Sequence, residues 1–213
     1  MLESSNPLNF VILSFWSLFV IVDPIGSVPT FLAMTERDSP EGRVRTAKLA
    51  SLVTFFVLVS FSLVGKWILS IFGISLSAFK VAGGVVLLKV ALDMLQAKQT
   101  AIKETPEEQA EGLTKDDIAV TPLAVPILAG PGAITAVVLL SGQATSFLYQ
   151  GVVVGNILLV SLITFLTLRV AALRSSIFSA ITLKIIARVM GLLLAAIATQ
   201  FILNGIQDAT HLW

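Results

Sequence analysis

The chain has 213 residues, of which 56% are hydrophobic and 13% are charged, and its formal net charge is +1. Soluble domains contain about 25% charged residues, so a water-soluble fold could not cover this much apolar surface. The near-neutral charge gives no reason to expect a nucleic-acid partner, and the lack of cysteine excludes disulfides and zinc-thiolate sites. The composition therefore predicts an all-α membrane protein whose outer solvent is the lipid bilayer.

Six stretches have the roughly 20 mainly apolar residues that a membrane-spanning helix requires. The predicted spans cover residues 8–35, 44–72, 74–96, 118–141, 147–169 and 184–207. The first is expected to remain a span, because no basic region of a cleavable signal peptide precedes it. These boundaries divide one membrane domain into a three-helix half (1–96), a polar cytoplasmic loop (97–117) and a second three-helix half (118–213).

Basic residues predict the orientation, because cytoplasmic loops carry an excess of Lys and Arg. Ten of the 14 basic residues lie in or beside the loops that follow the first, third and fifth spans. They are Arg37, Arg43, Arg45, Lys48, Lys98, Lys103, Lys115, Arg169, Arg174 and Lys184. The opposite side has only Lys66. We therefore expect a multi-pass protein of the plasma (inner) membrane with both termini outside.

The first and fourth predicted spans are interrupted by similar Pro-Gly motifs. Residues 23–30 read Asp-Pro-Ile-Gly-Ser-Val-Pro-Thr, and residues 129–135 read Ala-Gly-Pro-Gly-Ala-Ile-Thr. Gly26 and Gly132 are 106 residues apart, and residues 80–83 (Lys-Val-Ala-Gly) resemble residues 188–191 (Arg-Val-Met-Gly) at a separation of 108. The two matches predict a duplication. Because each half has three spans, the repeats would be inverted across the membrane.

The paired interruptions predict a binding site. Pro removes a backbone donor and Gly loosens a helix, and broken backbone is tolerated in a membrane only where protein or water satisfies it. The half-helices that start near Ser27 and Ala133 would offer free N–H groups to a carboxylate. The preceding carbonyl ends, together with Asp23, would suit an ammonium group. The candidate substrate-binding residues are Asp23, Gly26, Ser27, Thr30, Gly130, Gly132, Ala133 and Thr135.

A structural interpretation of the same motifs stays open. Asp-Pro-x-Gly is also typical of an ordinary turn in which Asp23 is the N-cap of the next helix. Pro-Gly kinks in membrane helices often serve packing alone.

Other polar or small residues within the spans have simpler interpretations. Lys89 and Asp93 are four residues apart and are expected to form a structural ion pair. Lys80 and Arg188 are expected to reach the interface or to neutralise helix carbonyl ends. The Gly-x-x-x-Gly pattern at residues 151–155 is typical of close helix packing and leaves a homo-oligomer contact open.

Both Pro-Gly motifs, the six spans and the central polar loop resemble those of the MarC family of bacterial and archaeal membrane proteins. The resemblance covers essentially the whole chain. It implies transport of small neutral amino acids such as glycine and alanine, which the residues alone do not specify.

The sequence thus favours a secondary transporter that works by alternating access around the broken helices. There is no P-loop motif for ATP, no cofactor is expected, and the coupling ion could be H⁺ or Na⁺. An enzyme is not expected, because the spans lack Cys, His and paired aspartates. A non-transporting membrane scaffold or envelope protein, and a transporter or exporter of another small solute, remain as alternatives.

Overall fold

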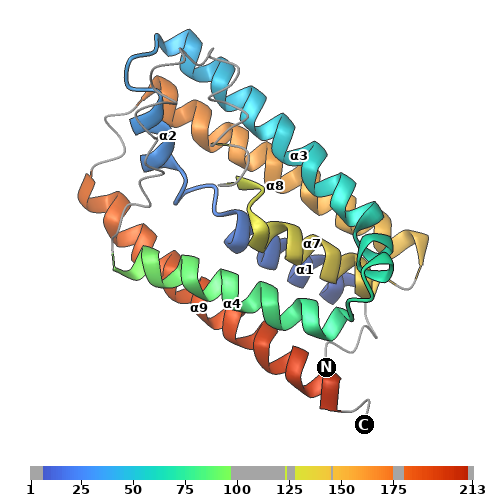
Figure 1. Cartoon of the computed structure of the whole chain (residues 1–213). Coiled ribbons are helices and arrows are strands. Elements are labelled where there is room, and N and C mark those ends of the chain that lie inside the picture. Colours follow the sequence, from blue (N-terminus) through green and yellow to red (C-terminus); the bar gives the residue numbers. More distant parts are fainter. Residues whose placement is uncertain (1–6, 97–122, 124–127, 145, 175–179, 211–213) are drawn as a thin grey trace.

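All regular secondary structure is helical in the residues that the computed structural model describes, which are 7–96, 123, 128–144, 146–174 and 180–210. The helices labelled in Figure 1 are α1 (Pro7–Val22), α2 (Val28–Met34), α3 (Pro40–Ile71), α4 (Leu76–Leu95), α7 (Pro131–Gln143), α8 (Phe147–Leu173) and α9 (Ala180–Thr210). The predicted polar loop at 97–117 lies outside these residues.

Three helical segments are long and apolar enough to cross a membrane: Pro40–Ile71, Phe147–Leu173 and Lys184–Thr210. Helix α4 has 20 residues but also carries three charged ones, Lys80, Lys89 and Asp93. At about 1.5 Å per residue, the 16 residues of α1 and the 13 residues of α7 are too short to cross a hydrocarbon core of about 30 Å. The prediction of an all-α protein is therefore confirmed in that it has helices long and apolar enough to span a membrane.

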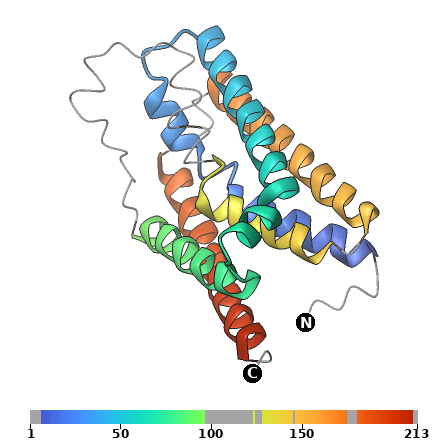
Figure 2. The ribbon, with the colours of Figure 1, turned by 45° about the vertical axis from the view of Figure 1, so that its right-hand side comes forward.

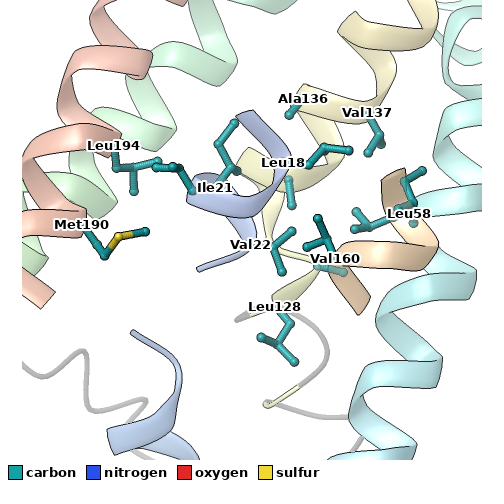
Figure 3. Packing of buried hydrophobic residues seen from close by; sticks show 14 of the residues in the cluster. Leu18, Ile21, Val22, Leu58, Leu128, Ala136, Val137, Val160, Met190 and Leu194 are labelled. Atoms are coloured by element: carbon teal, nitrogen blue, oxygen red, sulfur yellow. The ribbon is translucent and has the colours of Figure 1, made fainter. Parts of the chain in front are cut away.

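The long helices form two pairs on either side of two short ones. Helix α3 packs along α8, and α4 packs along α9, while α1 and α7 lie between the pairs and run in opposite directions (Figures 1 and 2). Buried side chains from these helices meet around the end of α1. Figure 3 shows Leu18, Ile21 and Val22 of α1 among Ala136 and Val137 of α7, Leu58 of α3, Val160 of α8, and Met190 and Leu194 of α9.

Serine caps and a glycine turn set the ends of α3 and α4. The hydroxyl oxygen of Ser39 accepts a hydrogen bond from the Gly42 N–H (3.2 Å), and that of Ser75 accepts one from the Ala78 N–H (3.1 Å). Such caps satisfy backbone donors that have no partner within the helix. Between the two helices, Gly73 has a φ of 64°, which glycine adopts without steric cost.

Glycines let the backbones of α4 and α9 approach closely. A Cβ atom added at Gly84 would lie 2.8 Å from the carbonyl oxygen of Ala198, and one added at Gly191 would lie 3.2 Å from that of Ala91. Gly84 and Gly191 are 107 residues apart, as are Ala91 and Ala198. The two contacts are therefore equivalent, with a glycine of each helix against an alanine of the other. By these contacts Gly191 corresponds to Gly84, whereas the sequence match paired Gly191 with Gly83.

The contacts of the charged residues differ from expectation. Lys80 forms an ion pair with Asp208 of α9 (Nζ–Oδ2 2.5 Å), so a carboxylate rather than helix carbonyl ends neutralises its charge. Lys89 and Asp93 form no ion pair in the described part of the chain. Lys89 is instead exposed.

The Gly-x-x-x-Gly pattern does not mediate packing within this chain. No atom of the described residues lies within 4 Å of a Cβ added at Gly151 or Gly155, and both glycines are exposed. The predicted close contact is thus absent there. Helix α8 is held by polar side chains instead: Asn156 donates hydrogen bonds to Ser14 Oγ (2.7 Å) and to the carbonyl oxygen of Val11 (3.1 Å) on α1.

Candidate functional site

The first Pro-Gly motif breaks a helix as predicted, and Asp23 organises the break. Helix α1 ends at Val22, and Asp23 has a φ of 49°, a left-handed conformation that Asp tolerates better than most residues. Its carboxylate Oδ1 accepts a hydrogen bond from the Gly26 N–H (3.0 Å). An added Cβ at Gly26 would overlap that carboxylate, so the turn requires glycine at this position.

The break satisfies most of its own backbone groups. The N–H groups of Ser27 and Val28 donate to the carbonyl oxygens of Asp23 (3.1 Å) and Ile25 (3.2 Å), and Ser27 Oγ donates to the carbonyl oxygen of Pro24 (2.9 Å). The N-cap of α2 is Ser27, not Asp23. The N–H groups of Ser27 and Val28 are therefore already used within the turn and Pro29 has none, so in the first turn of α2 only the Thr30 N–H makes no hydrogen bond to a described residue. Helix α2 itself has only seven residues.

The second motif leaves donors free. Helix α7 begins at Pro131, with Gly130 as its N-cap, and the Ile134 N–H donates to the carbonyl oxygen of Gly130 (3.0 Å). The N–H groups of Gly132 and Ala133 make no hydrogen bond to any described residue. Both residues are buried, and unpaired buried donors are costly, so this helix end is suited to accept a polar ligand.

The two breaks lie beside each other. An added Cβ at Gly132 would lie 3.7 Å from Ile21 Cγ2, and Ile21 is two residues before Asp23. The carbonyl end of α1 therefore meets the N–H end of α7 in the middle of the molecule (Figure 1). A helix carries partial negative charge at its carbonyl end and partial positive charge at its N–H end, so this junction combines both signs at one place.

Asp23 adds a formal charge to the negative side of the junction. The residue is 9% exposed and forms no ion pair with a described residue. A buried carboxylate without a cationic partner is unfavourable, which makes a cationic ligand group a suitable partner. No group of three or more His, Cys, Asp or Glu residues that could bind a metal ion occurs in the described ranges.

The hydroxyl of one of the two predicted threonines is already used within its own helix. Thr135 is buried, donates its hydroxyl hydrogen to the carbonyl oxygen of Pro131 (2.8 Å) and packs its side chain against Gly83 of α4. Thr30 lies half-buried on α2. The structure thus brings Asp23, Gly26 and Ser27 into one turn, and Gly130, Gly132 and Ala133 into the facing helix start.

Helix α4 contributes residues that sequence reasoning did not select. Gly83 accommodates Thr135, and Leu87 packs against Gly132. The only sequence signal for these contacts of α4 with α7 is the glycine pair at residues 83 and 84, since Leu87 is one of many leucines in an apolar span.

Comparison with known proteins gives consistent matches along the chain. A model of the MarC family of integral membrane proteins matches residues 8–210. A UPF0056 membrane protein of Methanocaldococcus jannaschii is 42% identical over 202 residues, which cover 95% of this chain and 98% of that protein. The UPF0056 membrane protein YvbG of Bacillus subtilis is 36% identical (93% and 95% covered), and YhcE of Escherichia coli is 33% identical (91% and 90% covered). No solved structure matches.

Proposed function

This chain belongs to the MarC family of integral membrane proteins, and on that basis we propose that it is a secondary transporter of small neutral amino acids resembling glycine and alanine. The observation that carries the proposal is the junction of α1 and α7. One side has Asp23 and a helix carbonyl end, and the other has the free N–H groups of Gly132 and Ala133.

An amino-acid zwitterion fits both sides of this junction. Its ammonium group would bind Asp23 and the carbonyl end of α1, and its carboxylate would bind the N–H groups of Gly132 and Ala133. The helix start itself carries only the small residues Gly130, Gly132 and Ala133, and the space beside Gly132 is taken by the side chain of Leu87. The neighbouring side chains leave little room, which favours a small substrate.

Alternating access follows from an inverted repeat, in which α1 and α2 form the first of six spans and α7 belongs to the fourth. The helix contacts support this arrangement. In this repeat α1, α3 and α4 of the first half correspond to α7, α8 and α9 of the second. Each of these helices contacts its own counterpart. The contact of α1 with α8 has its equivalent in that of α7 with α3, and the contact of α4 with α7 has its equivalent in that of α9 with α1.

Equivalent side chains on α3 and α8 also support the repeat. Thr54 and Thr164 are both fully buried, and each donates a hydrogen bond of 2.8 Å to the carbonyl oxygen four residues earlier. Ser51 and Ser161 are also buried, and neither hydroxyl has a hydrogen-bond partner. Both pairs are separated by 110 residues, so the same polar pattern recurs on the two helices.

An inverted repeat would allow transport by alternating access. Substrate sites between inverted halves lie at broken helices near the bilayer midplane, and one group of helices rocks against the other around that site. The charge bias of the loops supports an inner-membrane location with both termini outside. The drive would come from an H⁺ or Na⁺ gradient, and Asp23 is the group in the junction that either cation could reach.

The open face of α8 favours a second candidate function. Gly151 and Gly155 are exposed and uncontacted, so they could form an oligomer contact in a membrane scaffold that does not transport. Transport of a different small zwitterion or anion through the same junction is a further alternative.

Uptake into liposomes tests the transport function. Purified protein should accumulate labelled glycine or alanine under a proton or a sodium gradient, and the paired Gly26→Leu and Gly132→Leu substitutions should abolish uptake. A lack of uptake under both gradients would contradict the proposal and favour the scaffold. Undiminished uptake by the double variant would place the site elsewhere in the chain.

A further inference from the structure

Leu87 is the side chain that covers the start of α7. It lies on α4 and is 2% exposed. A Cβ added at Gly132 would overlap the end of the Leu87 side chain and lie 3.0 Å from its Cγ atom. The isobutyl group of Leu87 therefore occupies the space directly beside the backbone that carries the two free N–H groups.

Complementary packing fixes the position of Leu87. One turn earlier on the same helix, Gly83 receives the side chain of Thr135 from α7, while Gly132 of α7 receives Leu87 from α4. A small residue thus faces a large one at both contacts. Because buried side chains packed in this way cannot easily change position, Leu87 is held against the first turn of α7.

Apolar side chains also lie on the α1 side of the junction. Ile21 of α1 lies near Gly132, and Figure 3 shows Leu194 of α9 next to Ile21. Leu87 and Ile21 are the side chains nearest to a Cβ added at Gly132, so they are the first that the side chain of an amino acid bound at Gly132 and Ala133 would meet. A hydrogen atom or a methyl group needs little space there, whereas a branched side chain would overlap Leu87.

We infer that Leu87 is the specificity-determining residue, whose isobutyl group limits the substrate to amino acids with very small side chains. This inference depends on the proposed transport function and extends it to the basis of substrate size. One extra methylene changes discrimination by about 10- to 200-fold in an apolar pocket, so a single side chain is sufficient for such a limit.

The test compares Leu87→Ala with wild type and with Leu168→Ala. Leu168 is a matched control, because it is a fully buried leucine of α8 that contributes to no part of the junction. Initial uptake of labelled glycine, alanine, valine and leucine into liposomes is measured for each protein. We expect Leu87→Ala to raise the ratio of valine to alanine uptake at least tenfold, and Leu168→Ala to leave that ratio unchanged.

Further variants keep the test decisive if Leu87→Ala does not fold. Leu87→Val removes one carbon and should produce a smaller increase of the same ratio, whereas Leu87→Phe should reduce alanine uptake more than glycine uptake. Unchanged selectivity in folded Leu87 variants that still transport alanine would overturn the role of Leu87 and leave transport intact. An equal increase in Leu168→Ala would overturn it too, while no alanine uptake by wild type would contradict the transport function itself.

Discussion

Asp23 supplies both the backbone geometry and the charge of the break between α1 and α2. Its φ of 49° turns the chain, and its carboxylate accepts the Gly26 N–H. Asn shares the tolerance for a positive φ and has an amide oxygen that can accept the same hydrogen bond, but it carries no charge. The two contributions of Asp23 can therefore be separated by substitution.

We expect Asp23→Asn to reduce amino-acid uptake at least tenfold, because the substrate ammonium group loses its counter-charge. Its thermal stability should remain close to that of wild type. Asp23→Ala should also lower the free energy of unfolding by about 1–2 kcal/mol, since alanine disfavours this φ and cannot bind Gly26. Liposome uptake and thermal denaturation in detergent measure both effects. Full uptake by Asp23→Asn would show that the charge does not bind the substrate.

The sequence predicted the position of this break but not its hydrogen bonds. Pro24 and Gly26 indicate an interruption wherever they occur in an apolar span. The Asp-Pro-x-Gly pattern did indicate a turn at Asp23, and the hydrogen bond from the Gly26 N–H to its carboxylate agrees with that structural interpretation. The pattern did not specify which of the following N–H groups, at Ser27 and Val28, find partners within the turn. Leu87 was missed for a related reason: its contact with Gly132 joins two helices that are far apart in sequence.

Glycines on three helices illustrate the difference between a sequence motif and a contact in the structure. Gly84 of α4 and Gly191 of α9 lie against the backbone of the partner helix, whereas Gly151 and Gly155 of α8 contact nothing within the described chain. Sequence reasoning selected the α8 pair, because its spacing matches a common packing motif. Spacing reveals a face of small residues but not whether another helix covers it.

Replacing these glycines by alanine should change the stability of the protein in opposite directions on α8 and at the α4–α9 contact. Alanine is favoured over glycine within a helix by about 1 kcal/mol, so Gly151→Ala and Gly155→Ala should be neutral or stabilising. Gly84→Ala should destabilise the protein, because its added Cβ would lie 2.8 Å from a backbone oxygen and overpacking costs about 1–3 kcal/mol. Gly191→Ala should have a smaller effect, because the nearest atoms there lie at 3.0 Å or more. Thermal denaturation of the four variants measures these effects. Marked destabilisation by Gly151→Ala or Gly155→Ala would instead reveal a contact between copies.

Apart from the short helix α2, which contacts both α8 and α9, the described helices form two groups that share a narrow contact. Helices α4 and α9 pack closely along each other, and α1, α3, α7 and α8 form the second group. The main connection between the groups runs along α4 and α7, where glycines face side chains at Gly142–Leu76, Gly83–Thr135 and Gly132–Leu87. Under the proposed mechanism, α4 and α9 would move together against the second group.

Engineered disulfides test this division, and the chain has no cysteine of its own to interfere. Cysteines at positions 76 and 142 would join the two groups, since an added Cβ at Gly142 lies 3.7 Å from Leu76 Cγ. Cysteines at positions 65 and 138 are the control within one group, where an added Cβ at Gly65 lies 3.2 Å from Val138 Cβ. Oxidation should stop uptake only in the first variant, and a reductant should restore it.

The opposite outcome is equally informative. Undiminished uptake by the fully oxidised variant at positions 76 and 142 would mean that α4 and α7 do not move relative to each other. Equal inhibition of the control would place the moving boundary within the second group. The sequence could not predict this division, because it shows which segments are apolar but not how closely each pair of helices packs.

The ion pair between Lys80 and Asp208 makes one end of the α4–α9 pair sensitive to its surroundings. The Lys80 side chain is 13% exposed and that of Asp208 is 48% exposed, and the pair joins the start of α4 to the end of α9. If these helix ends lie in the aqueous interface, dissolved ions reach the carboxylate. Mobile ions screen such a pair increasingly as ionic strength rises, over a Debye length of about 10 Å at 0.1 M salt. The salinity of the compartment at this end therefore sets how firmly this ion pair joins the two helices, while salt in the opposite compartment, behind the bilayer, has no access to it.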